Sequence, residues 1–265
     1  MAVVFFPNSI NKQIACIYKD VLMIQIKLYG DQTLKGYTLL EVFPGIGLVG
    51  AMAGSYIIEK LKMENIGRIE SESFPPITAI HNATPMFPAR IYKSEESKIV
   101  LFMAEFSMPP QSVYQLSQEM LSFSRKYGIT RIVSVGGLPS QKPTNRIYVA
   151  SSNKDIMKAA LKSGIQPVQE GIIAGVSASL LAYGADYKIP VMDILVEVNP
   201  QIMDPKYAET AITGLNKLLG INIDLNELHK EAKLVEAKIR EMLNKVKDHQ
   251  QAYPPQPPTD QSMYA

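Results

Sequence analysis

The chain has 265 residues, of which 46% are hydrophobic and 20% are charged, and its formal net charge is +2 at pH 7. This composition is typical of a globular protein with one large core, and the scattered Lys and Arg residues give nucleic-acid binding no electrostatic support. A single cysteine, Cys16, excludes an intramolecular disulfide, and no apolar run reaches the ~20 residues of a membrane span. We therefore expect a cytoplasmic protein.

Short hydrophobic runs alternate with helical patterns along most of the chain. Strands are predicted at about 21–28, 37–43, 66–71, 89–92, 98–103, 130–135, 147–151 and 191–198. Helices are predicted at about 48–61, 110–127, 154–161, 171–183 and 206–219, and Gly128 and Gly220 are expected to end two of them. This alternation predicts an α/β fold, with a mostly parallel or mixed sheet covered by helices on both faces.

The pattern changes after Asp224. Seven apolar residues recur at alternating steps of three and four from Leu225 to Val246, which predicts a heptad-patterned helix over residues 224–248. Such a helix could pack on its own domain, taken as residues 1–223, or on a neighbouring subunit. Residues 249–265 are rich in Gln and Pro, a composition that predicts a flexible, extended tail.

Gly45, Gly47 and Gly50 form a G-x-G-x-x-G pattern between a predicted strand and a predicted helix. In dinucleotide-binding domains such glycines bring a pyrophosphate to a helix N-terminus, and Glu70 lies at about the spacing of a ribose ligand. A tight strand-to-helix turn with close helix packing needs the same glycines without a ligand. A nucleotide- or nucleoside-binding enzyme that uses this turn is therefore the alternative to the function considered below.

Other catalytic motifs are incomplete. Ser177 follows Gly175 as in a nucleophile elbow, but the second glycine is absent, and the three histidines are dispersed. The carboxylates of Glu70, Glu72 and Glu105 are not brought together by any spacing in the sequence, and their default interpretation is solvated charge. We expect no catalytic residues, no metal and no cofactor.

Several sequence blocks, in order, resemble the proteasome assembly chaperone family of the second-subunit type. The blocks are residues 41–50, 57–61, 68–76, 88–92, 136–139, 171–176, 203–208 and 218–221. The resemblance covers about residues 35–225. It implies a single three-layer α/β/α domain, similar in layout to nucleoside phosphorylases, in homo-oligomers without established catalysis. Gly45, Gly47 and Gly50 belong to the family signature, and the resemblance assigns them no ligand.

The chain ends in Met263, Tyr264 and Ala265, a hydrophobic-Tyr-any sequence. A terminal carboxylate can pair with a lysine in a partner's pocket, and the tyrosine supplies a rigid anchor. Some archaeal members of the family end in this way, and the motif is held to enter pockets between α-subunits of the proteasome core particle. The resemblance thus implies an ATP-independent chaperone or adaptor of archaeal type that binds the core-particle α-ring.

Overall fold

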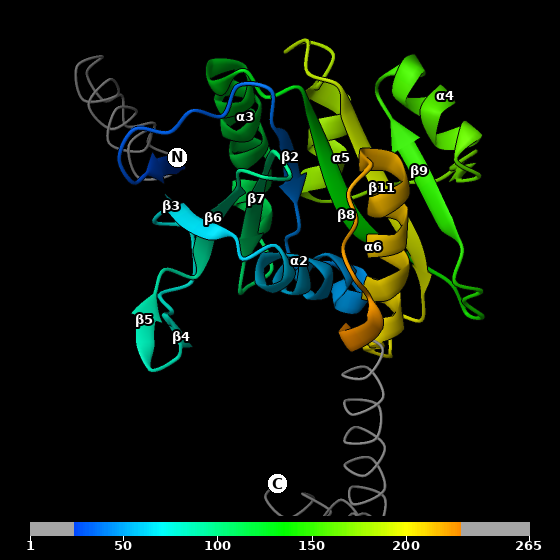
Figure 1. The fold of residues 1–265 in the computed structure, drawn as a ribbon, viewed down its shortest axis with the longest axis horizontal. Helices are drawn as coiled ribbons and strands as arrows, with labels where there is room; N and C mark the ends of the chain where they lie inside the picture. The colour runs from blue at the N-terminus through cyan, green and yellow to red at the C-terminus, as the bar shows by residue number, and fades with distance from the viewer. Residues whose placement is uncertain (1–23, 229–265) are drawn as a thin grey trace, which may run out of the picture.

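A nine-stranded mixed sheet forms the centre of the computed structural model, which describes residues 24–228 (Figure 1). β2, β7, β8 and β11 form its parallel part, and β6, β3 and β1 extend it as an antiparallel series from β7. β9 runs antiparallel to β11, and β10 is parallel to β9. In spatial order the strands are β1 (Gln25–Leu28), β3 (Glu64–Glu70), β6 (Ala89–Ser94), β7 (Ile99–Ala104), β2 (Thr38–Glu41), β8 (Arg131–Pro139), β11 (Val191–Val198), β9 (Ile147–Ser151) and β10 (Gln166–Pro167).

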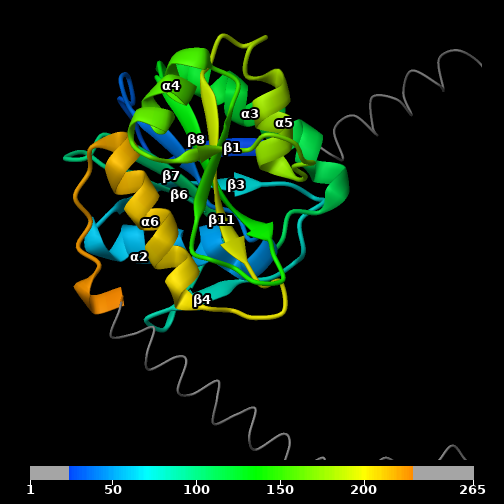
Figure 2. The same ribbon diagram turned by 90° about the vertical axis from the view of Figure 1, so that its right-hand side faces the viewer.

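Helices cover both faces of this sheet (Figure 2). One face carries α2 (Val49–Lys60), α4 (Lys154–Lys162) and α6 (Pro205–Leu219), and the other carries α3 (Pro110–Tyr127) and α5 (Val176–Tyr183). Successive side chains of a buried strand point to opposite faces, so Leu40 packs beneath α2 while Leu39 packs on the α3 side. The predicted mixed α/β sheet with helices on both faces is confirmed.

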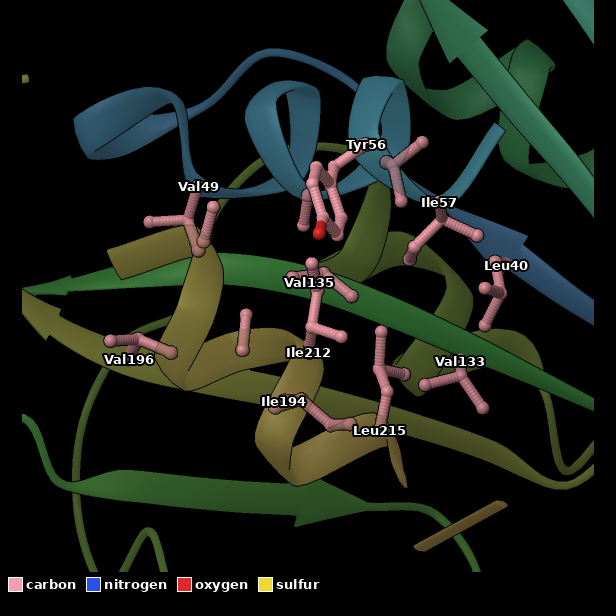
Figure 3. Packing of buried hydrophobic residues seen from close by; sticks show 14 of the residues in the cluster. Leu40, Val49, Tyr56, Ile57, Val133, Val135, Ile194, Val196, Ile212 and Leu215 are labelled. Carbon is pink, nitrogen blue, oxygen red and sulfur yellow. The ribbon is translucent and has the colours of Figure 1, made fainter. Parts of the chain in front are cut away.

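The core beneath α2 and α6 is built from aliphatic side chains of three neighbouring strands. Figure 3 shows Tyr56, Ile57, Ile212 and Leu215 of the two helices over Leu40, Val133, Val135, Ile194 and Val196 of β2, β8 and β11. All of these side chains are buried. Val and Ile suit such strands because their branched side chains fill a pleated surface between two helical layers.

Helix ends follow the local signals in the sequence. α3 and α6 begin at Pro110 and Pro205, where a missing backbone N–H costs no helical hydrogen bond, and Asp204 caps α6 by accepting a hydrogen bond from a backbone amide. Both helices end at a left-handed glycine, Gly128 with φ of 68° and Gly220 with φ of 67°. The two predicted glycine stops are confirmed.

Several element boundaries differ from the prediction. The helix predicted from residue 171 begins at Val176, because Gly175 has a φ of 87°, which no right-handed helix contains. β8 continues through Gly136 and Gly137 to Pro139, since its residues from Ile132 to Pro139 all pair with β11. A hairpin of β4 (Ala79–His81) and β5 (Thr84–Met86), which projects at the lower left of Figure 1, and the short β10 were not predicted.

The predicted heptad helix falls almost entirely outside the described residues, which end at Leu228, and the predicted tail falls wholly outside them. Cys16 and the residues Met263, Tyr264 and Ala265 also lie outside. Over residues 24–228, no helix combines the length and the apolar character needed to cross a membrane.

Candidate functional site

A cavity of ≈ 350 Å³ opens at the carboxyl ends of β2 and β8, between the sheet and the start of α5. The chain leaves β2 toward α2 on one face, and it leaves the neighbouring parallel strand β7 toward α3 on the opposite face. In open α/β sheets, ligands bind where such connections diverge. The turn at Pro44–Ile46, the end of β8 and the loop before α5 form most of the wall. The topology therefore makes this cavity the candidate functional site.

Three polar residues lie in one row across the sheet, and the row begins at the cavity. Glu41 of β2 is in register with Ser134 of β8, which is in register with Asp193 of β11. Residues in register project from the same face, here the face covered by α3 and α5. All three side chains are buried, and Glu41 lines the cavity directly. Two carboxyl groups are thus held close together inside the protein.

Burial changes the protonation of this pair. Desolvation raises the pKa of Glu41 to about 7, although the backbone amide of Phe43, at 3.0 Å, and the nearby Ser134 hydroxyl partly offset it. Desolvation and the charge of Glu41 raise the pKa of Asp193 to about 8, and the hydroxyl of Ser177 on α5 offsets this only in part. Near neutral pH, each group can therefore serve as an acid or as a base.

The hydrogen bonding of this row is incomplete. Neither carboxyl oxygen of Asp193 nor the hydroxyl of Ser134 completes a hydrogen bond of normal geometry within the described part of the chain. Buried polar atoms are nearly always paired, so such orphaned atoms require an explanation. The residues that line the cavity include no Lys, Arg or His. The carboxyl pair therefore has no cation beside it in the cavity wall.

The glycines of the turn after β2 have different structural roles. Gly47 adopts a φ of 67°, which favours glycine, and a Cβ on Gly50 would lie 2.6 Å from the carbonyl oxygen of Val135. Gly45 has a φ of −139°, and nothing lies within 4 Å of the point that a Cβ would occupy there. Close approach of α2 to β8 thus accounts for Gly50, and the tight turn accounts for Gly47, without any ligand.

Glu70 lies far from this turn. Its strand, β3, is separated from β2 by β6 and β7 and pairs only antiparallel, whereas a dinucleotide-binding unit places the next strand parallel and adjacent. Its carboxylate accepts hydrogen bonds from Lys27 and Arg68 instead. Glu70 therefore cannot contact a ribose bound at Gly45–Gly50, and the structure gives the nucleotide-binding alternative no support.

Glu105 is an ion-pair partner and not a solvated charge. Its carboxylate accepts a hydrogen bond from the buried guanidinium of Arg90 and another from His81, whose Nε2 lies 2.8 Å from Oε1 of Glu105. Burial alone would raise its pKa, but these hydrogen bonds outweigh burial and lower the pKa below its usual value. The three residues join β4, β6 and the end of β7. Across residues 24–228, no cluster of His, Cys, Asp or Glu has a composition that could hold a metal ion.

Sequence reasoning missed the carboxyl row. Asp193 and Ser134 each have apolar residues on both sides, within VMDIL and RIVSV, and Glu41 ends a third buried strand. One polar residue inside a fully buried strand was the available signal, because charged residues are almost never fully buried without a partner. The sequence does not show that the three strands are neighbours.

The family model described as the PAC2 family matches residues 39–243. This chain belongs to the PAC2 family. Two uncharacterized proteins of Methanocaldococcus jannaschii are similar to this PAC2 chain. One is 26% identical over 204 residues, which are 77% of this chain and 84% of the relative. The other is 25% identical over 250 residues, which are 92% of this chain and 97% of the relative.

Solved structures share the fold of this PAC2 chain. Pyrococcus furiosus PbaA, described as an archaeal homolog of proteasome-assembly chaperone, matches with a TM-score of 0.77 and 25% identity, over 86% of this chain and 95% of that protein. Pyrococcus furiosus PbaB, described as an archaeal proteasome activator, matches with a TM-score of 0.73 and 23% identity, over 83% of this chain and 98% of that protein. The family and fold expected from the sequence blocks are thus confirmed at this level.

Proposed function

We propose that this PAC2 chain is an ATP-independent chaperone or adaptor of the proteasome core particle. The observation that carries the proposal is its membership of the PAC2 family, together with its 25% identity to a structure described as a homolog of proteasome-assembly chaperone. The sequence contains no G-x-x-x-x-G-K-[ST] motif, so a P-loop nucleotide cycle is not part of the proposal.

The proposed contact is the insertion of Met263, Tyr264 and Ala265 into pockets between α-subunits of the core particle. The sequence supports this in two ways. Tyrosine combines a rigid apolar ring with a polar end, and the terminal carboxylate adds a charge for a lysine in the pocket. The Pro-rich composition of residues 249–265 is suited to carry this anchor away from the domain.

We further propose that the chain acts as a cytoplasmic homo-oligomer. The α-ring presents several equivalent pockets, and one isolated three-residue anchor binds weakly. Several anchors on one oligomer gain avidity without any new contact, because the first binding event raises the effective concentration of the others. The heptad pattern of residues 224–248 is a candidate element for bringing subunits together.

The test is binding of the purified full-length chain to purified proteasome core particle, beside a variant that ends at Ser262. We expect the truncation to leave the thermal unfolding temperature unchanged and to remove most of the affinity. Tyr264→Ala should weaken binding nearly as much as the truncation. Tyr253→Ala is the matched control, since it removes the same side chain from the same Pro-rich segment and should leave affinity unchanged.

Two results would contradict parts of this proposal. Equal binding by the full-length and truncated chains would replace the terminal anchor with an interface on the folded domain, while leaving a proteasome partner in place. If neither form bound the finished particle or isolated α-subunits, the proteasome partner would be wrong, and this chain would share only its family and fold with the proteasome-related proteins.

A further inference from the structure

The cavity at the ends of β2 and β8 has an apolar wall around a polar base. Phe43, Met108, Val113 and Leu195 contribute to the wall, and Ile172, which is 97% exposed, stands in the loop at its rim. The lining also includes the carboxyl group of Glu41 and the hydroxyl groups of Ser107 and Ser177. Small-molecule sites are commonly of this kind, mostly apolar with a few convergent polar groups.

Asp193 lies behind the cavity wall, next to two residues that line it. Its Oδ1 atom lies 3.9 Å from the position of a Cβ on Gly136, and Ser177 acts on its carboxyl group, while both Gly136 and Ser177 line the cavity. Asp193 is fully buried, and neither of its carboxyl oxygens completes a hydrogen bond of normal geometry within residues 24–228. A fully buried acid with open acceptors beside a cavity is suited to receive a donor from a ligand.

The charge of the ligand follows from the charges around the cavity. The wall holds no cationic side chain, and the titratable group that acts on Asp193 is Glu41. The pair is covered by α3 and α5, and its neighbouring strands are β7, β8 and β9. Within the described chain, none of these elements places another charged group against either acid. A phosphate or carboxylate here would meet like charge, whereas a cation would be attracted.

We propose that this cavity binds a small primary amine with an apolar body, its ammonium group between the carboxyl groups of Glu41 and Asp193. The ammonium supplies three donors, and the three oxygens of Ser134 and Asp193 that complete no hydrogen bond of normal geometry can accept them. The apolar body occupies the wall at Phe43 and Leu195. This inference rests on residues 41–195 of the described domain and is independent of the proteasome proposal.

Binding releases a proton. An alkylammonium ion stays charged between pH 6 and pH 8, as a lysine side chain does, whereas burial keeps both carboxyl groups largely protonated at pH 6. The bound ammonium pairs with a carboxylate, whose proton passes to solvent. The affinity should therefore rise about fivefold from pH 6 to pH 7, as the ionised fraction of a group with a pKa of about 7 does.

The probe is 2-phenylethylamine, with 2-phenylethanol and 3-phenylpropanoate as neutral and anionic matches, added at millimolar concentration to the full chain. Isothermal titration calorimetry in buffers of different ionisation enthalpy measures both the affinity and the proton release. We expect saturable binding of the amine only. Glu41→Gln and Asp193→Asn should each lower the affinity about tenfold or more, as loss of a charge-assisted hydrogen bond does.

Ser177→Leu narrows the cavity and leaves both acids intact, so it tests the site even if the acid variants fail to fold. It should also abolish amine binding, while Asp186→Asn, an exposed site on the same side of the protein, should not. No binding of the amine, equal binding of all three probes, or amine binding unchanged in Ser177→Leu would each overturn the proposal. Displacement of the amine by Ca²⁺ or Mg²⁺ would likewise overturn it in favour of a metal site.

Discussion

Asp193→Asn should change how the stability of the domain depends on pH. Asparagine has nearly the shape of a protonated aspartic acid but cannot ionise, so it removes the titration and keeps the volume. In the folded protein the pKa of Asp193 is raised from its ordinary value of 3.8 to about 8. A raised pKa of an acid means that its protonated form stabilises the fold, and this stabilisation is lost as pH rises from 3.8 toward 8.

The size of the effect follows from these two values. Between pH 5 and pH 8 the unfolded chain has Asp193 ionised while the folded chain holds it protonated, so each pH unit lowers the free energy of unfolding by ~1.4 kcal/mol. Over three pH units this amounts to ~4 kcal/mol. Such a change is a large part of the roughly 5–15 kcal/mol that stabilises a typical domain. The variant should therefore gain ~4 kcal/mol relative to the wild type from pH 5 to pH 8.

Equilibrium unfolding in urea at pH 5, 6, 7 and 8, followed by circular dichroism, measures this difference. Asp186→Asn is the matched control, because it makes the same chemical change at an exposed position. Its curve should run parallel to that of the wild type. If the Asp193→Asn curve also runs parallel, Asp193 is ionised in the folded protein at all these pH values, and the reasoning about the buried acid pair is wrong.

Two further predictions concern the packing and the charges of the domain. Glu105→Ala should lower the free energy of unfolding by ~3 kcal/mol, because it leaves the buried guanidinium of Arg90 without its carboxylate. Glu95→Ala removes an exposed carboxylate from its ion pair with Lys93 and should leave the free energy of unfolding nearly unchanged; urea unfolding measures both. Gly50→Ala should lower the free energy of unfolding by ~1–3 kcal/mol, because its Cβ would lie 2.6 Å from a backbone oxygen of β8. The thermal unfolding temperature should fall accordingly. Gly45→Ala should be tolerated, since nothing lies within 4 Å of its Cβ position, and equal effects of the two changes would contradict this explanation of the turn.

Much of the local structure could be predicted from the sequence. Val191–Val198 and Ile99–Ala104 are continuous apolar runs, and such runs form strands when helices cover both of their sides. Gly128 and Gly220 end helices for a reason local to one residue, since glycine enters the left-handed region at no steric cost. The helix at 171–183 was predicted too long because Gly175 has a φ of 87°, and α5 begins only after it.

The candidate cavity could not be found in the same way. Glu41, Ser134 and Asp193 come together only because β2, β8 and β11 are neighbours in the sheet, although long stretches of chain separate the three strands. Likewise, Glu105 meets Arg90 through the pairing of β6 with β7, and the hairpin of β4 and β5 brings His81 to the same carboxylate.

The family, the element types and the position of most helix ends can be read from the amino-acid order, because these depend on local patterns and on motifs taken in sequence. The folded chain was needed to learn which strands are adjacent, which glycines permit close packing, and that two acids share one buried environment with open acceptors. Strand order and burial are non-local quantities: they depend on how distant segments exclude water from one another, and no single window of the chain contains that information.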